Sequence, residues 1–334
     1  MVTINKQIKI NQLPSGIPRK EDFFIEENPI LVPKDGQFLA KSLILSLDPY
    51  VRAVMSGRHF YNAPKSGDVM RSRGLARVID SSHSKYNKND LLVMETGMQE
   101  YCISDGEDSY LVDTGSAPLS TALGILGMPG LTSYAALLGP AAIKKNDLVL
   151  VSAASGAVGS MVSQIANIKG AKTIGIAGSD EKCDWCLKNA KFDFCINRKK
   201  DNLDEVLSEI APNGVDIFFD NTGGEIQHKV LTKHIANYSR IIISGLMTQY
   251  NVASAPPGPN LGNIVKMKAT IYGFVVYDFE HMRKSFINDV KAWYADGLIN
   301  FKEDITNGIE TAPDQFIKLM NGNNFGKTLV QLSD

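Results

Sequence analysis

The alternation of hydrophobic and polar residues changes character near residue 146 and divides the chain into two parts. Before that point, short apolar runs are bounded by Pro, Gly, Asn and Asp, which is typical of strands. The expected strands are residues 38–47, 69–80 and 90–94. They predict a partly open β-barrel, followed by a helical connector at residues 124–138 that contains a Pro–Gly break.

Beyond residue 146, apolar strands alternate with helical patterns. The expected strands are residues 148–153, 173–177, 194–196, 215–220, 239–244 and 269–276, with helices between most of them, for example at 161–169 and 202–211. This alternation predicts an α/β fold with a parallel, doubly wound sheet. Ligands of such sheets bind at the carboxyl ends of the strands.

Composition narrows the class of protein. The chain has 334 residues, of which 44% are hydrophobic and 21% charged, and its formal net charge is −1. It can therefore form two domains with cores of their own, and its charge favours neither nucleic acid nor an anionic membrane surface as a partner. The sequence shows no apolar run of about 18 residues and no core of a signal peptide, so we expect a cytoplasmic protein with no membrane span.

The four cysteines fit an intracellular, reduced protein. Cys183 and Cys186 form a C-x-x-C, a spacing typical of redox and zinc sites. No second such pair and no nearby pair of histidines completes a metal site. We interpret the two cysteines as incidental residues of a helix, and we expect no metal.

A Gly-rich turn at residues 151–160, VSAASGAVGS, joins a predicted strand to a predicted helix. Gly156 allows the backbone to approach a pyrophosphate, and Gly159 allows the helix to lie close to the strand. The first Gly of the usual G-x-G-x-x-G pattern is Ala154. The motif is compatible with a dinucleotide site and with an ordinary tight turn.

The residues after the second strand favour NADP over NAD. NAD enzymes usually place an acid about 20 residues after the turn, where it binds the ribose 2′-hydroxyl. Here that place falls near Ala177 and Gly178, and Ser179, Lys182 and Arg198 follow as groups suited to a 2′-phosphate. The alternative is that the two cations are solvated surface charges. The nearby acids at positions 180 and 181 would have to point away or cap the next helix.

Eight segments resemble one known family in their order and spacing. They are LSLDPYVR, GMPGLTSYAALL, AASGAVGS, GSDEKC, FDNTGG, ISGLMTQYN, GFVVYDF and GNNFGKTLV. Together they are similar to the zinc-free medium-chain reductases, and especially to the prostaglandin reductase and leukotriene B4 dehydrogenase family with its 2-alkenal and curcumin reductase relatives. The resemblance covers nearly the whole chain.

The resemblance implies a Rossmann domain inserted into a GroES-like domain. The GroES-like substrate domain would comprise residues 1–124 and 305–334, with residues 326–332 as a last returning strand, and the Rossmann domain residues 125–304. The implied cofactor is NADPH, bound in the cleft between the domains. The implied cofactor-binding residues are Met128, Thr132, Gly156, Ala157, Val158, Gly159, Ser179, Lys182, Arg198, Asn221, Gly245, Tyr250, Phe274, Val275, Val276 and Asn324. The family usually has Tyr at the position of Arg198, but Arg also binds phosphate and stacks on adenine.

The family reduces the activated C=C bond of α,β-unsaturated ketones and aldehydes. The zinc enzymes of the wider superfamily use Cys and His ligands, but residues 52–60 supply no Cys, so the chemistry is expected to run without a Lewis acid. Hydride transfer to the β-carbon fits, because hydrogen-bond donors can stabilise the enolate oxygen. Tyr250 is the candidate catalytic residue, with a structural role over the cofactor as the alternative. Tyr61 and Tyr50 are candidate substrate contacts, although Tyr61 could be a surface aromatic and Tyr50 structural.

Two other functions remain open at this point. A quinone reductase would have the same fold and cofactor, but the loop at residues 256–260 and the tyrosine-bearing segment 248–251 favour an enone reductase. A non-catalytic NADPH-binding redox sensor would keep the cofactor site without turnover. The apolar strand at 269–276 is expected at a sheet edge, where it would pair with a second copy and form a homodimer.

Overall fold

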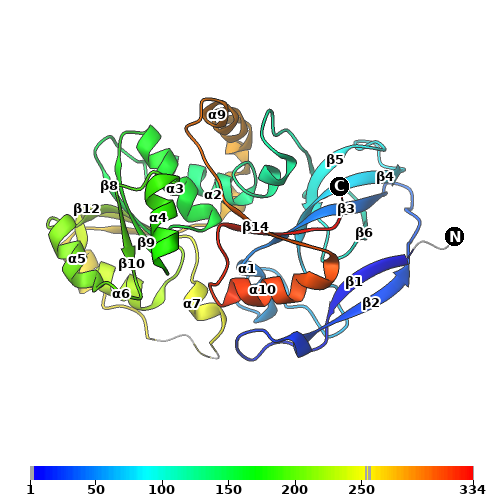
Figure 1. The fold of residues 1–334 in the computed structure, drawn as a ribbon, viewed down its shortest axis with the longest axis horizontal. Coiled ribbons are helices and arrows are strands. Elements are labelled where there is room, and N and C mark those ends of the chain that lie inside the picture. Colours follow the sequence, from blue (N-terminus) through cyan, green and yellow to red (C-terminus); the bar gives the residue numbers. More distant parts are fainter. Residues whose placement is uncertain (1–3, 253, 255–256, 334) are drawn as a thin grey trace.

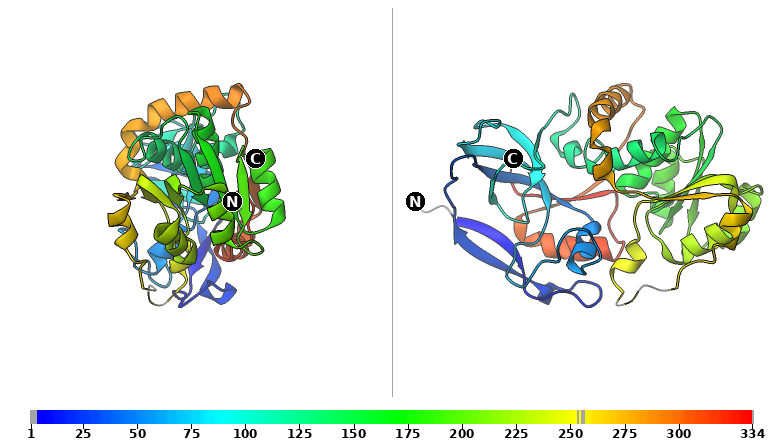
Figure 2. Two further views of the ribbon diagram at one scale, coloured as in Figure 1. Left: turned by 90° about the vertical axis from the view of Figure 1, so that its left-hand side faces the viewer. Right: turned by 180° about the vertical axis from the view of Figure 1, so that it is seen from behind.

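Two sheets lie beside one another in the computed structural model, which describes residues 4–252, 254 and 257–333. The blue-to-cyan sheet and the green-to-yellow sheet occupy opposite ends of the molecule (Figure 1). The red C-terminal segment lies between them when the molecule is seen from the front and from behind (Figure 2). The predicted loop at 256–260 begins with a residue that lies outside the described part.

Within the described residues, six parallel strands form one sheet in the order β10-β9-β8-β11-β12-β13. The strands are β8 (Leu148–Ser152), β9 (Lys172–Ala177), β10 (Phe194–Asn197), β11 (Val215–Asp220), β12 (Ile235–Ile243) and β13 (Thr270–Gly273). The chain winds outward from β8 to β10 and then returns to the other side of β8. This is the strand order of a Rossmann sheet, with its switch point between β8 and β11. The predicted doubly wound fold is confirmed.

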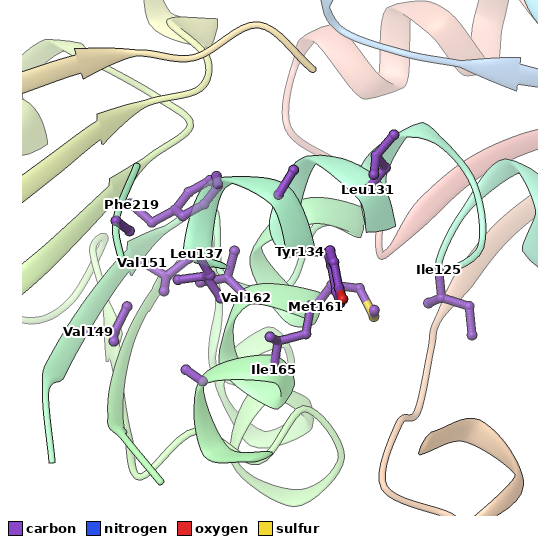
Figure 3. Close-up of a cluster of buried hydrophobic side chains, with 14 of the residues drawn as sticks. Ile125, Leu131, Tyr134, Leu137, Val149, Val151, Met161, Val162, Ile165 and Phe219 are labelled. Atoms are coloured by element: carbon purple, nitrogen blue, oxygen red, sulfur yellow. The ribbon is translucent and has the colours of Figure 1, made fainter. Parts of the chain in front are cut away.

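Helices cover both faces of this sheet because successive strand residues point in opposite directions. Val149 and Val151 pack under α2 (Met128–Leu138), α3 (Ala157–Ile168) and α9 (Arg283–Ala295), as Figure 3 shows for α2 and α3. Leu150, between the two valines, packs on the opposite side with α5 (Leu203–Ile210) and α6 (Gly224–Lys233). The two cores hold the strand ends, and therefore the turns that follow them, in fixed positions.

Within the described chain, seven strands form a second, mainly antiparallel sheet. They are β3 (Phe38–Leu47), β4 (Arg73–Ser81), β5 (Leu91–Glu95), β6 (Tyr101–Ser104), β7 (Tyr110–Leu111), β14 (Glu303–Asn307) and β15 (Lys327–Gln331). The predicted returning strand is β15, which pairs antiparallel with β3 and parallel with β14. β1 (Ile4–Ile10) and β2 (Phe23–Pro29) form a separate antiparallel pair. The predicted domain boundaries stay a prediction.

Shorter elements connect and flank the sheets. They are η1 (Lys20–Asp22), α1 (Tyr50–Met55), η2 (Leu119–Leu123), α4 (Asp180–Lys188), α7 (Met247–Tyr250), α8 (Gly262–Lys266), η3 (Val276–Met282), η4 (Ile309–Thr311) and α10 (Ala312–Met320). Among the described residues, no helix has the length and apolar character needed to cross a membrane.

Two local predictions were wrong in detail. The Pro–Gly pair at 129–130 begins α2 instead of breaking a helix, because proline fits the first turn, where its missing N–H would have no helical partner. The predicted strand 269–276 ends at Gly273, since Phe274 makes one last bond to Ile243 O (2.9 Å) and the chain then turns into η3.

Candidate functional site

The two sheets enclose a cleft with a volume of about 500 Å³. It lies at the carboxyl ends of β8, β9 and β11, where ligands of doubly wound sheets bind. The sequence-predicted residues that line it are Tyr50, Met128, Thr132, Gly156, Ala157, Val158, Gly159, Lys182, Arg198, Asn221, Gly245, Tyr250, Phe274, Val275, Val276 and Asn324. Ser179 and Tyr61 are not among the lining residues.

The turn between β8 and α3 brings the backbone against the cleft. Gly156 is the N-cap of α3, so the free N–H groups of the first helical turn lie at the cleft wall. A Cβ on Gly159 would lie 2.5 Å from Ala153 O, whereas one on Gly156 would lie 3.2 Å from the same oxygen. Glycine at 159 is therefore needed for α3 to lie this close to the strand, and the turn offers the N–H groups that a pyrophosphate requires.

Two cationic side chains follow the strands next to β8, namely β9 and β10. Lys182 lies in the first turn of α4 and its Nζ donates to Gly322 O (2.9 Å), while Arg198 follows β10. The pKa of Lys182 is lowered by burial and by the charges of Lys199 and Arg198. Cations held together in this way are stabilised by an anion between them, so this end of the cleft fits a phosphate.

Ser179 and Asp180, shortly before Lys182, bond to other groups of the protein. Ser179 is the N-cap of α4, and its Oγ accepts the Lys182 N–H at 3.3 Å. Asp180 accepts a hydrogen bond from Asn197 Nδ2 (2.6 Å) and pairs with Lys200, and both interactions lower its pKa, that with Lys200 most. The Asp180 carboxylate is therefore bound to Asn197 and Lys200. Ser179 as a phosphate ligand stays a prediction, because its hydroxyl can still donate.

Sequence reasoning missed the carboxylate that shapes the turn after β11. Asp220 is fully buried and accepts hydrogen bonds from Ser152 Oγ (2.8 Å) and Gln227 Nε2 (2.9 Å) and from the backbone of Thr222 (2.9 Å) and Gly223 (3.0 Å). Ser152 Oγ in turn accepts the Asn221 N–H at 2.8 Å. The signal that could have identified it is an acid at the end of a buried strand, immediately before Asn-Thr-Gly-Gly.

Asn221 and Thr132 bring polar side chains to the cleft from two different elements, the end of β11 and α2. Asn221 Nδ2 donates to Ser152 O (2.8 Å), which fixes the side-chain amide. Thr132 Oγ1 donates to Met128 O (2.8 Å) within α2. Because its hydroxyl proton is used in this bond, Thr132 is oriented to accept a hydrogen bond from a ligand.

The three candidate tyrosines occupy different places. Tyr250, in α7, lines the cleft, its Oη accepts the Leu246 N–H at 3.3 Å, and burial raises its pKa. Tyr50, in α1, also lines the cleft. Tyr61 is not among the lining residues, but its ring stacks on that of His59, which does line the cleft, with centroids 5.0 Å apart. The roles assigned to all three stay predictions.

A buried ion pair beside the cleft was also missed. Lys327 Nζ contacts Asp48 Oδ1 (2.6 Å) and Leu47 O (3.2 Å), and Ser46 Oγ donates to Asp48 Oδ2 (2.5 Å). Both charged residues line the cleft, and the preceding Gly326 bridges to Gly156. The pair therefore joins β15 to the end of β3 within the second sheet, and the bridge at Gly326 joins that sheet to the turn of the first. Its partners lie 279 positions apart in the sequence, so no local pattern could have identified it.

No metal site is formed by the side chains of the described residues, since no three His, Cys, Asp or Glu come together as a group that could hold an ion. Cys183 and Cys186 lie in α4 and are unpaired. The expectation of a reaction without metal stays a prediction.

Comparisons with known proteins assign both parts of the chain. Residues 6–112 match a family described as the N-terminal domain of oxidoreductase, and residues 157–292 match one described as zinc-binding dehydrogenase. The NADPH-dependent curcumin reductase of Escherichia coli (strain K12) is 36% identical over 98% of this chain and 97% of its own length. Prostaglandin reductase 1 of Bos taurus is 39% identical over 95% of both chains.

A solved relative has the same architecture. The crystal structure of CurA from Vibrio vulnificus in complex with NADPH matches with a TM-score of 0.92 and 37% identity, and covers 98% of this chain and 99% of that one. The similarity therefore spans the two sheets and the cleft between them.

Proposed function

Because the chain belongs to the zinc-free medium-chain reductase family of NADPH-dependent curcumin reductase and prostaglandin reductase 1, we propose that it reduces the activated C=C bond of α,β-unsaturated ketones and aldehydes with NADPH. The observation that carries the proposal is a single cleft with two chemically different ends. One end offers the α3 N-terminus, Lys182 and Arg198 to phosphates, and the other offers tyrosine hydroxyls beside apolar side chains.

The cofactor would extend along the carboxyl edge of the parallel sheet. The turn at 156–159 would hold the pyrophosphate, and Lys182 with Arg198 the 2′-phosphate. Asn221, Thr132 and Met128 would surround the nicotinamide half, together with Gly245, Phe274, Val275, Val276 and Asn324. The donor and acceptor groups described above support this assignment.

Bound NADPH would supply the hydride that adds to the β-carbon of the substrate. The chain's own residues then have to stabilise the negative charge that spreads onto the carbonyl oxygen. We assign this role to Tyr250. The assignment is supported by its position on the cleft wall and by its Oη, which accepts the Leu246 N–H and so leaves its own proton for a ligand oxygen. Burial raises its pKa, so Tyr250 stays protonated and acts as a donor at neutral pH.

The first experiment is NADPH oxidation in the presence of 2-nonenal, a linear enone, curcumin and a quinone, with NADH as the control cofactor. Turnover of the enal or the enones with NADPH, and much less with NADH, is the expected result. Turnover of the quinone alone would instead identify a quinone reductase. Tight NADPH binding with no turnover at all would identify a cofactor sensor.

Tyr250→Phe tests the role of the hydroxyl. If Tyr250 only positions the substrate, kcat should fall by about tenfold or less, whereas loss of an essential proton donor should lower it by about 100-fold or more. A loss of less than about threefold would contradict any catalytic role. NADPH affinity should be unchanged in the variant if the tyrosine contacts substrate rather than cofactor.

We also propose that the protein is a cytoplasmic homodimer. β13 lies at the edge of the parallel sheet, and Ile271 and Tyr272 on it are each 39% exposed, which supports pairing with a second copy. The unpaired cysteines support a reducing compartment. Gel filtration with light scattering tests the dimer, and a monomer at micromolar concentration would contradict it.

A further inference from the structure

Aromatic side chains of the cleft lining contact one another in a continuous series. The ring centroid of His59 lies 5.4 Å from that of Tyr50 and 4.1 Å from that of Phe60. Phe60 in turn lies 5.8 Å from Tyr277, with the two ring planes nearly perpendicular. All four residues line the cleft, and Phe60 is 60% exposed. Covering an exposed apolar ring is favourable, and aromatic faces and edges suit a planar ring of a ligand.

The segment that carries His59 is bound to elements of the parallel-sheet part. Arg58 Nη1 donates to Gln249 O in α7 at 2.9 Å, and the ring of Phe60 contacts that of Tyr277 in η3. α7 and η3 follow strands of the parallel sheet, whereas α1 and the segment after it follow β3 of the other sheet. His59 lies between the two anchored residues, so contacts to both parts of the chain hold it at the cleft.

The orientation of the His59 ring is fixed by its neighbour. Its Nδ1 accepts the Tyr61 N–H at 3.3 Å, and its ring stacks on the Tyr61 ring at 5.0 Å with an angle of 11° between the planes. The Tyr61 ring also lies 3.7 Å from the guanidinium carbon of Arg71, which pairs with Glu95 at 3.0 Å. A ring held by a hydrogen bond and by a stacked partner has little freedom to turn.

These contacts determine which ring nitrogen of His59 carries the proton. Since Nδ1 accepts a hydrogen bond, the single proton of the neutral ring is on Nε2. Burial and the charge of Arg71 lower the pKa of His59, so the neutral ring predominates at neutral pH. Among the described residues, no group accepts a hydrogen bond from Nε2. His59 therefore adds one neutral donor to the aromatic part of the lining.

We propose that His59 is a specificity-determining residue that selects unsaturated carbonyl substrates bearing an oxygen-substituted aryl group. The aryl ring lies against Phe60 and Tyr277, and His59 Nε2–H donates to the ether or hydroxyl oxygen of that ring. A neutral donor suits a neutral oxygen, and the cation beside it, Arg71, is already paired with Glu95. The inference rests on the proposed function and adds a contact separate from the one to the reacting carbonyl.

The test compares two enones of similar size in the parent enzyme, His59→Phe and His59→Gln. Para-methoxybenzylideneacetone carries an acceptor oxygen on its ring, and para-ethylbenzylideneacetone has a methylene in its place. Phenylalanine keeps a ring that can stack on Tyr61 but has no donor, whereas the glutamine amide keeps a donor. The effect of the methoxy group on the reacting double bond is the same in every variant, so it cancels from the comparison.

The measured quantity is the ratio of kcat/KM for the methoxy enone to that for the ethyl enone. We expect His59→Phe to lower this ratio about fivefold, the effect of one neutral hydrogen bond, and His59→Gln to stay within about twofold of the parent. His83→Phe is the matched control, because His83 Nδ1 accepts the Lys85 N–H at 3.0 Å in the same way but His83 does not line the cleft. Its replacement should leave the ratio unchanged.

A second readout needs no turnover. Calorimetry measures the binding of the two saturated ketones, para-methoxybenzylacetone and para-ethylbenzylacetone, to the enzyme loaded with NADP⁺. His59→Phe should lose about fivefold in affinity for the methoxy ketone relative to the ethyl ketone, and His59→Gln should not. If His59→Phe does not fold, His59→Leu takes its place, since leucine also lacks a donor.

The two readouts separate this inference from the proposed function. A parent enzyme that reduces neither enone, yet loses its relative affinity for the methoxy ketone in His59→Phe, contradicts the proposed function and leaves the His59 contact standing. An enzyme that reduces both enones with an unchanged ratio in His59→Phe overturns the role of His59. Equal losses for the two enones would also overturn it, since the histidine would then act on the segment or on the carbonyl that both substrates share.

Discussion

Replacing Lys182 with Ala should weaken the binding of NADPH far more than that of NADH. The two cofactors differ only in the 2′-phosphate, and Lys182 lies at the cationic end of the cleft with Arg198 and Lys199 close enough to lower its pKa. Among the described residues, its ammonium group donates a hydrogen bond to Gly322 O, a neutral partner that does not satisfy its charge. The lysine is therefore available to an anion.

The size of the effect follows from burial and from the cations that remain. A hydrogen bond to a charged group contributes about 1.5–3 kcal/mol to binding when its partner is removed from water. Lys182 is half-buried, and Arg198 stays in place in the variant, so the loss should fall in the lower part of that range. About 2 kcal/mol corresponds to about a 30-fold increase in the Kd of NADPH. The Kd of NADH should change by less than about twofold.

The assay is a fluorescence titration of both cofactors against the parent protein, Lys182→Ala and Lys188→Ala. Lys188 is a matched control, because it lies on the same helix, is exposed and pairs with Asp184 at 3.6 Å. Its replacement removes the same charge away from the cleft and should leave both affinities unchanged. Equal losses for NADPH and NADH in Lys182→Ala, or none for either, would refute the assignment of the 2′-phosphate site.

Three further predictions concern pH, packing and the buried ion pair. As pH rises toward the ordinary lysine pKa of 10.5, NADPH affinity should fall while NADH affinity stays constant, because the pKa of Lys182 is lowered and its side chain loses its charge below that pH. Titrations of both cofactors across that pH range measure the difference, and parallel losses of affinity would contradict the prediction. Gly159→Ala should lower the free energy of unfolding by about 2 kcal/mol, and NADPH affinity with it, since the new Cβ would lie 2.5 Å from a backbone oxygen. Gly156→Ala should lower the free energy of unfolding by less, and calorimetry compares the two variants. Lys327→Met should lower the free energy of unfolding, measured in urea, by about 3–5 kcal/mol, because Asp48 is left buried without its cation. Adding Asp48→Asn should recover part of the loss. A loss below about 1 kcal/mol in Lys327→Met would show that the ion pair does not stabilise the fold.

Most of the parallel sheet could be predicted from the sequence because its signals are local. Each strand is a short apolar run between turn residues, and each helix has its own apolar face. The errors arose where a local signal had two meanings. A Pro–Gly pair predicts a helix break, yet proline also suits the first turn of a helix, as in α2.

The residues of the candidate site could be predicted only in part, and the difference between those predicted and those missed has a physical cause. The turn at 156–159, Lys182 and Asn221 were found because a turn motif or a strand end marks them. Asp220 and the Lys327–Asp48 pair were missed, since their importance comes from partners supplied by other elements. Tyr61 carries the same type of side chain as Tyr50, but only the folded chain shows that Tyr50 lines the cleft and Tyr61 does not.

By itself, the sequence determined the elements, the dinucleotide-type turn and the expected order of strands and helices, because these depend on residues close together in the chain. The tertiary structure decided which residues line the cleft together, how the C-terminal strand joins the two sheets and which N–H group the Tyr250 oxygen accepts. Those outcomes depend on contacts between segments far apart in the sequence. Such contacts form only when burial of the two sheets brings the segments together, so no local pattern records them.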